Sequence, residues 1–274
     1  MSISVQTNTG SLMALDNLRT NTDFQSKTIQ RLTSGYRINS SGDDAAGLAV
    51  ANSYRSQVAE LSQGIRNAND GLSQLQIVDG GLNNISKMVD RLRTLATQAA
   101  SDTFTGDLAT LSNEFTAIKT EIDRQAANIG LVTGGANAKV SEVYVGGGSS
   151  QANSIVGLDL TTTSVVDQTG LTINGDSLTS KANAKTALTH LTAATTKLGT
   201  IQGQVGSSQN KLQYAVNLAS SQSTNIAAAE SRIRDADIAA EASNLTKAQV
   251  LQQSSMAALA QANSAPQSVL SLLR

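Results

Sequence analysis

The chain has 274 residues, of which 39% are hydrophobic and only 3% aromatic, with no tryptophan and no cysteine. Its 20 basic and 21 acidic side chains give a net charge of −1, so no positive field is available to hold a nucleic-acid backbone or an anionic membrane surface. The lack of cysteine excludes disulfides and thiolate metal sites, and a single histidine, His190, excludes metal sites built from several histidines. We therefore expect no nucleic-acid partner, no metal and no cofactor.

The first twenty residues carry neither the basic start nor the continuous apolar stretch of a secretory signal. No run in the chain approaches the ~18 apolar residues that a spanning helix needs, so the sequence predicts no membrane span. The same N-terminal region has a helical pattern of apolar residues, namely Leu12, Leu15, Leu18, Ile29 and Leu32. These side chains are apolar enough to require a partner surface.

A long helix is predicted next. Over residues 58–99, apolar side chains recur at alternating steps of three and four, with one irregular step, which is a heptad pattern. The carboxylates of Asp43 and Asp44 suit a helix N-terminus. We expect the helix to end near residue 100, after roughly 80 Å at 1.5 Å per residue.

A break at residues 101–106 separates this helix from a second apolar seam of the same period over 108–129. A short connection between two amphipathic helices makes them antiparallel neighbours. Glycine, valine and threonine dominate the following segment, 130–180. There the pattern predicts short strands at 140–145, 155–160 and 164–173, with a hairpin turn at 146–148.

Helical periodicity then returns, with residues seven apart from Leu191 to Ile233 beside a companion row of small side chains. The C-terminal segment is also helical in pattern and as apolar as the N-terminal one. Together these elements predict a mostly α fold. It is a long antiparallel coiled-coil rod whose C-terminal half folds back along the N-terminal half, with a small β-hairpin region at the tip.

Three possible chemical sites have simpler interpretations. His190 lies on a helical pattern without a second metal ligand, so we expect a packed or solvent-facing side chain. Asp235 and Asp237 lack the spaced oxygen ligands of a calcium loop, and Asp235 is predicted to cap a helix. The S-x-x-K spacing of residues 208–211 has no companion motif of an acyl enzyme. We therefore predict no catalytic residues and no enzyme activity.

Two long stretches at opposite ends of the chain carry a family resemblance. Residues 14–51 include Arg37-Ile38-Asn39 and Asp43-Asp44-Ala45-Ala46-Gly47-Leu48, and residues 232–274 include Leu259-Ala260-Gln261-Ala262-Asn263 and Pro266-Gln267. These stretches resemble the N- and C-terminal signatures of bacterial flagellin, the subunit of the flagellar filament. Residues 44–129 and 183–231 resemble the helical core of the family. The departures are Ser254-Ser255, where the family commonly has Ala-Gly, and a short middle segment.

The resemblance implies a division of the chain into two layers of a filament. The two ends form an inner coiled-coil layer, and the middle forms an outer layer. The inner layer takes residues 1–43, which include a linker, and residues 235–274. The outer layer takes the helical rod 44–129, the β region 130–180 and the return helix 181–234.

The resemblance also implies a function and partners. The chain would self-assemble into the filament used for swimming, outside the cell, after export through the flagellar type III path without a cleaved signal peptide. Its partners would be copies of itself, an export chaperone, and the filament cap and hook-filament junction proteins. The apolar residues expected to bury on assembly are Leu12, Leu15, Leu18, Leu32, Leu251, Leu259, Leu270, Leu272 and Leu273.

Two smaller sets of residues match family motifs. The linker between the layers corresponds to Ser34, Gly35, Asn39, Gly42 and Asp43. The patch that a vertebrate toll-like receptor recognises on flagellin monomers corresponds to Arg91, Leu95, Gln98 and Glu114. For this second set, packing of the rod is the primary expected role.

Two alternatives remain open. The hook-filament junction protein shares the terminal motifs, and a coiled-coil scaffold would explain the heptads but not the terminal signatures. A scaffold should form closed oligomers, whereas a flagellin should grow open filaments.

Overall fold

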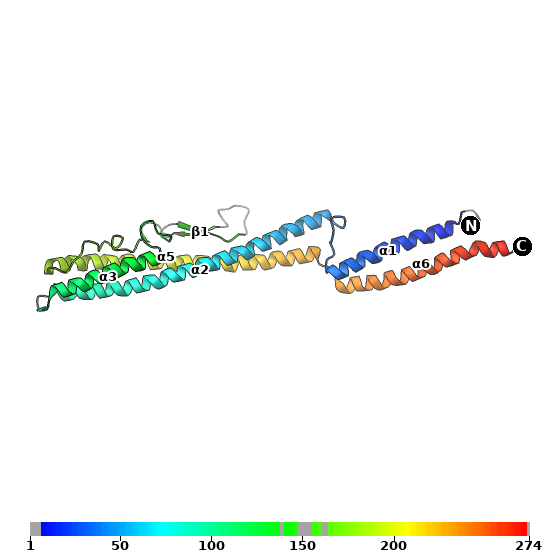
Figure 1. Ribbon diagram of the computed structural model, residues 1–274. Coiled ribbons are helices and arrows are strands. Elements are labelled where there is room, and N and C mark those ends of the chain that lie inside the picture. Colours follow the sequence, from blue (N-terminus) through cyan, green and yellow to red (C-terminus); the bar gives the residue numbers. More distant parts are fainter. Residues whose placement is uncertain (1–6, 138–139, 147–154, 160–163, 273–274) are drawn as a thin grey trace. The chain divides into compact units, whose positions relative to one another are not determined.

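The computed structural model describes residues 7–137, 140–146, 155–159 and 164–272. The chain divides into two compact units (Figure 1). The first unit combines Met1–Ser56 with Asn225–Arg274, and the second is Gln57–Thr224. The predicted mostly helical fold with a small antiparallel β region is confirmed.

The second unit contains most of α2 (Ala45–Ala100), all of α3 (Leu108–Asn128) and most of α5 (Lys181–Arg234). The predicted heptad seam of α2 is largely buried, and α3 and α5 each contribute a buried row of the same period. The buried seam of α2 comprises Leu61, Ala68, Leu75, Val78, Leu82, Ile85, Val89, Leu92, Ala96 and Ala99. The facing row of α5 includes Leu191, Leu198, Val205 and Leu212.

The break between α2 and α3 lies where the sequence predicts it. Asp107 caps α3, because its carboxylate accepts hydrogen bonds from the Ala109 backbone N–H at 2.9 Å and the Thr110 hydroxyl at 3.0 Å. These hydrogen bonds lower the pKa of Asp107 below its ordinary value. The two helices run antiparallel, with the side chains of Arg91 and Glu114 hydrogen-bonded across them.

A two-stranded hairpin packs on α2. Strand β1 (Val140–Tyr144) pairs antiparallel with β2 (Ile155–Asp159), from Val140 opposite Asp159 to Tyr144 opposite Ile155. Helix α2 offers glycine at two positions one heptad apart, Gly64 and Gly71. The backbone of Val145 and the side chain of Val143 approach these two positions, so the small residues allow the hairpin segment to lie close to α2. Residues 147–148 of the predicted turn lie outside the described residues.

The third predicted strand is wrong. Residues 164–180 form turns in which Val165, Val166, Leu171 and Ile173 are buried, although no strand of the described chain pairs with them. Their backbone groups bond locally and to side chains of α3 and α5, for example Ile173 N–H to the Gln168 carbonyl at 2.9 Å. A valine-rich segment can therefore be buried without joining a sheet.

The first unit pairs the terminal helices α1 (Thr9–Ser34) and α6 (Ile238–Leu272) along their length. Asn8 Nδ2 donates to the Ala262 carbonyl at 2.7 Å, and Asn21 Nδ2 donates to Ser255 Oγ at 2.9 Å. These partners run in opposite directions along the two helices, so the pair is antiparallel. Of the helices described between residues 9 and 272, none combines the length and apolar character needed to cross a membrane.

Candidate functional site

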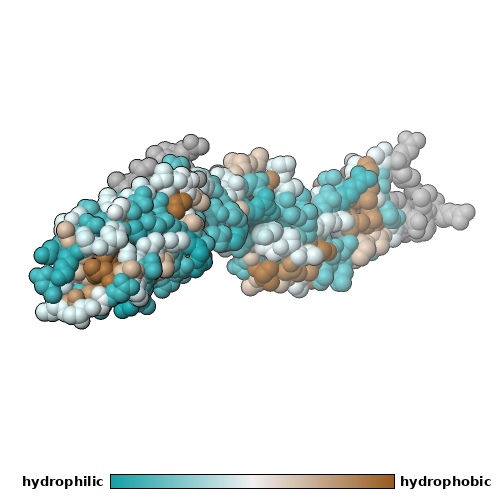
Figure 2. Space-filling model, turned by 60° about the vertical axis from the view of Figure 1, so that its left-hand side comes forward, coloured by the Kyte–Doolittle hydropathy of each residue, from teal (hydrophilic) through white to brown (hydrophobic). Residues whose placement is uncertain are grey.

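Helix α6 carries exposed apolar side chains that point in several directions. Val250 is 57% exposed, Met256 is 50% exposed and Leu251 is 38% exposed. Successive residues of an α-helix differ by about 100°, so these three side chains point roughly 100–140° apart around the helix. A helix that is apolar all round belongs in a buried environment. Within one chain α1 covers only one side of α6, so the remaining sides are available to other molecules. Figure 2 shows brown, hydrophobic patches on the surface of this helix pair.

The apolar residues predicted to drive assembly fall into two groups. Leu15, Leu18, Leu32 and Leu259 are partly buried, whereas Leu12 is 57% exposed and joins Leu251 on the surface. Three further leucines lie near the C-terminus. Leu270 and Leu272 are in the last turn of α6, where side chains lie outside the described part of the structure, and Leu273 lies outside the described residues altogether.

The interior of the helix pair also contains polar side chains. Thr28 is 1% exposed, and its hydroxyl donates to the Phe24 carbonyl of its own helix at 2.9 Å. Glu241 is 8% exposed and accepts a hydrogen bond from Arg31 Nη1 at 3.4 Å. The second carboxylate oxygen of Glu241, Oε2, is buried without a hydrogen-bond partner. Because hydrogen bonds are directional, the contact between Arg31 and Glu241 favours one alignment of the two helices.

The predicted linker residues run from the last residue of α1, Ser34, into the segment before α2. Gly35 ends α1 in the left-handed conformation, with φ of 73°, and its N–H donates to the Arg31 carbonyl at 2.9 Å. The Asp43 carboxylate accepts from the backbone N–H groups of Ser40 and Asn39 at 3.1 and 3.2 Å, and these bonds lower the pKa of Asp43. Gly42 is exposed, and Ser34 Oγ accepts from the Tyr36 N–H at 3.2 Å.

Helices α2 and α6 each begin with an aspartate cap. Asp44 caps α2, accepting from the Gly47 N–H at 2.9 Å. Asp237, not Asp235, caps α6, because its carboxylate accepts from the N–H groups of Ala239 and Ala240. The predicted capping role of Asp235 is therefore wrong; its carboxylate accepts instead from the Ser231 hydroxyl at 2.6 Å.

The four residues matched to the receptor patch are in the second unit. Glu114 Oε1 accepts from Arg91 Nε at 2.8 Å and Nη2 at 2.6 Å, and both side chains are about half-exposed. Gln98 is exposed on α2, whereas Leu95 is 1% exposed and belongs to the core. The structure thus brings Arg91 and Glu114 together and places Leu95 beneath the surface.

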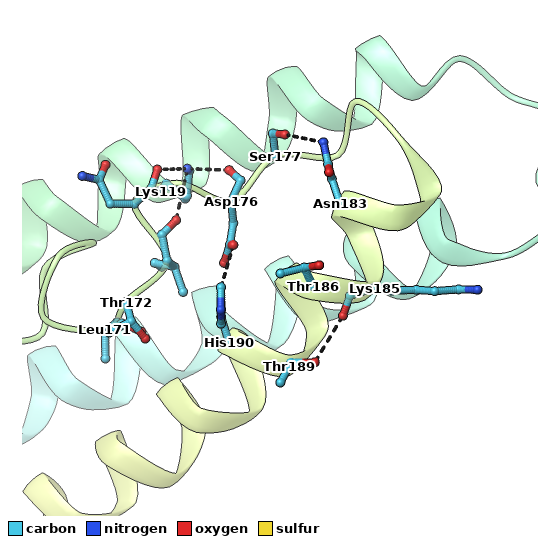
Figure 3. Close-up of polar contacts among 12 residues, drawn as sticks. Lys119, Leu171, Thr172, Asp176, Ser177, Asn183, Lys185, Thr186, Thr189 and His190 are labelled. Carbon is cyan, nitrogen blue, oxygen red and sulfur yellow. Dashed lines mark hydrogen bonds and ion pairs between the residues drawn. The ribbon is translucent and has the colours of Figure 1, made fainter.

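A buried lysine holds the turns at residues 164–180, a role that the sequence analysis missed. Lys119 of α3 is 5% exposed, and its ammonium donates to the carbonyls of Ile173, Asn174 and Asp176 at 3.3, 3.1 and 2.8 Å (Figure 3). Burial lowers the pKa of Lys119 below its ordinary value, and the charge of Asp176 opposes this shift. The only sequence signal was a lysine between the apolar seam positions 118 and 122.

Three further contacts hold the same turns. His190 Nδ1 is hydrogen-bonded with Asp176 Oδ1 at 2.7 Å, from α5 (Figure 3). Asp123 of α3 accepts from the Gln168 N–H at 2.8 Å, and Lys197 Nζ donates to the Gly170 carbonyl at 2.6 Å. His190 therefore contacts the turns while its side chain stays 43% exposed, which agrees with the packed or solvent-facing side chain expected from the sequence. Among the described residues, no group of three or more His, Asp or Glu side chains could hold a metal ion.

Comparison with known proteins agrees with these features. Residues 5–129 match the model of the bacterial flagellin N-terminal helical region, and residues 182–273 match that of the bacterial flagellin C-terminal helical region. The chain is 34% identical over 264 residues to a flagellin of Halalkalibacterium halodurans, covering 94% of this chain and 95% of the relative. It is 36% identical over 267 residues to the flagellar filament 33 kDa core protein of Treponema phagedenis, covering 90% and 92%.

A solved structure is also similar. The crystal structure of Bacillus cereus flagellin is 31% identical, covers 60% of this chain and 94% of that chain, and has a TM-score of 0.48. Flagellins are structural proteins, and the two terminal matches together span most of the sequence. The paired terminal helices and the helical second unit are thus those of a filament subunit, and the chain belongs to the bacterial flagellin family.

Proposed function

We propose that this chain polymerises with copies of itself into the flagellar filament, with the terminal helix pair in an inner layer and the second unit in an outer layer. The observation that carries the proposal is the exposed apolar surface around α6, which α1 alone leaves uncovered. The inner layer comprises residues 1–43 and 235–274. The outer layer comprises residues 44–129, 130–180 and 181–234.

The physical mechanism is burial of apolar side chains between copies. Contacts between different surfaces of identical subunits do not close on themselves and so generate helical polymers. An obligate interface of this kind typically buries more than ~2,000 Å² in total. Leu12, Val250, Leu251 and Met256 would lose their exposed area on assembly. From the sequence, Leu270, Leu272 and Leu273 are expected to add further apolar side chains to the interface.

Polymerisation is tested by adding a precipitating salt to the purified chain and examining it by negative-stain electron microscopy. We expect long uniform tubes. Val250→Asp should abolish them, because a carboxylate would be buried between copies, while Val250→Ile should preserve them. Circular dichroism of both dilute variants should be the same. Tubes formed by Val250→Asp would contradict the proposed role of α6.

Removal of Leu270, Leu272 and Leu273 provides a second test. We expect this truncation to prevent polymerisation while the second unit remains folded and unfolds at an unchanged denaturant midpoint. Small closed particles from the full-length chain would instead support a scaffold or a hook-filament junction protein. Filaments from the truncated chain would show that these leucines are not required.

Membership of the flagellin family supports a proposal about export and partners. We propose that the chain leaves the cell through the flagellar type III path, with a chaperone covering the apolar surface of α6 before export. The filament cap and the hook-filament junction protein would then contact the growing polymer. A chaperone that covers α6 should protect the amides around Val250 and Leu251 from hydrogen exchange in the complex and leave those of α3 unprotected. Equal protection of both helices would contradict this assignment.

Recognition by a host toll-like receptor is a separate proposal. Its support is the paired geometry of Arg91 and Glu114 beside the exposed Gln98, which presents a polar surface on α2 and α3. Leu95 would act from below, by holding this part of α2 in place.

A further inference from the structure

The connecting segments of the first unit meet in a short antiparallel contact. Arg37 N–H donates to the Arg234 carbonyl at 2.6 Å, and Ala236 N–H donates to the Gly35 carbonyl at 2.9 Å. Between these two bonds, Tyr36 lies opposite Asp235 as in one step of an antiparallel ladder. We call residues 35–37 and 234–236 the clasp. It joins the segment that follows α1 to the segment that precedes α6.

Each segment of the clasp also supplies an arginine to the other. Arg37 Nη2 donates to the Ile233 carbonyl, near the end of α5, at 2.8 Å. The guanidinium of Arg234 lies 4.0 Å from the centroid of the Tyr36 ring, within cation–π distance. The Nε of Arg234 is buried without a hydrogen-bond partner, and its Nη1 lies 4.0 Å from the Glu230 carboxylate. The Tyr36 ring and the Glu230 carboxylate therefore both lie 4.0 Å from this guanidinium, and of the two only the ring belongs to the opposite segment.

The position of the clasp allows it to influence how α1 and α6 are aligned. Gly35 ends α1, and α6 begins at Ile238, so the clasp holds both helices at their common end. Apolar side chains around α6 give little preference for one alignment over another displaced by one turn, because apolar contacts are not directional. Directional bonds of the clasp act together with the polar contacts along the pair, such as those from Arg31 to Glu241 and from Asn21 to Ser255, to select one alignment.

We propose that the clasp sets the register of α1 against α6. In this proposal Arg234 is the positioning residue, because its contact with the Tyr36 ring holds the two segments of the clasp together. The register decides which apolar side chains face outward together. The inference therefore builds on the proposed function, but it concerns a property of the unassembled chain.

The lack of cysteine in the chain permits a direct measurement of register. Asn21 and Ser255 are replaced by cysteine together, because their side chains are hydrogen-bonded in the observed register. A second double variant pairs Asn21→Cys with Leu259→Cys, one turn further along α6. In the parent chain, we expect the 21–255 disulfide to form at least tenfold faster than the 21–259 disulfide.

Changes to the clasp should then reduce this selectivity. Adding Arg234→Ala or Tyr36→Ala should bring the two rates within about threefold of each other, whereas Tyr36→Phe, which keeps the ring, should retain the tenfold preference. Undiminished selectivity in Arg234→Ala would overturn the proposal. Polymerisation is scored separately by electron microscopy, so a parent chain that shows the tenfold selectivity but forms no tubes would count against the proposed function alone.

Hydrogen exchange distinguishes positioning from general stabilisation. In Arg234→Ala, the amides of Arg37 and Ala236 should exchange at least tenfold faster than in the parent chain. The Gly35 amide, which bonds within α1, should be unchanged. Equally faster exchange at all three amides would mean that Arg234 only stabilises the helices, and that result would also overturn the proposal.

Discussion

The carbonyl group of Val145 occupies the space that a Cβ atom on Gly64 would need. Helix α2 is therefore close enough to the hairpin segment that its backbone touches the backbone of the chain beyond β1. Gly71, one heptad later, faces the Val143 side chain in the same way, with an ideal Cβ 3.2 Å from Val143 Cγ2. The two glycines account for the placement of the hairpin along α2.

Gly64→Ala should destabilise the second unit. The added methyl group meets backbone atoms, which cannot move aside as a flexible side chain could, so we expect a loss of about 1–3 kcal/mol in the free energy of unfolding. Gly80→Ala on the same helix is the matched control, because nothing lies within 4 Å of its Cβ position. The control should be neutral or gain up to about 1 kcal/mol from helix propensity. Denaturant unfolding of both variants checks this, and equal stabilities would show that the close approach is absent.

Lys119→Met should destabilise the turns at residues 164–180. It removes the ammonium donor from the carbonyls of Ile173, Asn174 and Asp176 while keeping a side chain of similar length. Leaving buried acceptors unpaired costs about 1–3 kcal/mol. The control is Lys185→Met, at an exposed position of α5, and it should change the free energy of unfolding by less than about 0.5 kcal/mol. If both variants unfold at the same urea concentration, the carbonyl contacts do not stabilise the fold.

Glu121 should make stability depend on acid pH. Hydrogen bonds from Arg124, and then from Gln125, lower the pKa of Glu121 from 4.5 to about 2. A carboxyl group whose pKa is lower in the folded chain stabilises the fold above pH 4.5, and this contribution disappears as the pH falls toward about 2. The stability difference between the parent chain and Glu121→Gln should therefore shrink between pH 5 and pH 2.5. A constant difference across this range would mean that the pKa is not lowered.

Arg91→Ala should weaken toll-like receptor activation if the proposed contact exists, and it should hardly affect the fold. The Arg91–Glu114 ion pair is about half-exposed, and such pairs contribute about 0–1 kcal/mol. The control is Arg93→Ala, a nearby exposed residue of α2. A cell-based receptor assay on the monomeric variants checks the prediction. Unchanged signalling by Arg91→Ala would remove the support for this patch.

The helices were predictable from sequence because their periodic apolar residues are the ones that become buried. The seam of α2 and the break before Asp107 needed only local information about spacing and capping. Residues 164–173 were not predictable in this way. Their valines and isoleucine have the composition of a strand, but the partners of their backbone carbonyls include lysine side chains of α3 and α5, 54 and 27 residues away in the sequence.

The candidate site was predictable to a similar extent. The apolar pattern identified the residues of the terminal helices, but it could not separate Leu15, inside the pair, from Leu12, outside it. By residue type, Asp235 and Asp237 were equally suitable caps for α6. Only the observed start of the helix at Ile238 shows that Asp237 is the cap. The clasp could not be foreseen, because it joins residues almost 200 positions apart, such as Arg37 and Arg234.

Lys119 does for the turn at residues 173–176 what a calcium or sodium ion does in many other proteins, which is to gather carbonyl oxygens around a positive charge. Here the charge is covalently attached to α3. It cannot be diluted away, captured by a chelator or exchanged when the mineral content of the surroundings changes. A filament subunit that works outside the cell can in this way keep a metal-like structural element without depending on the supply of a metal.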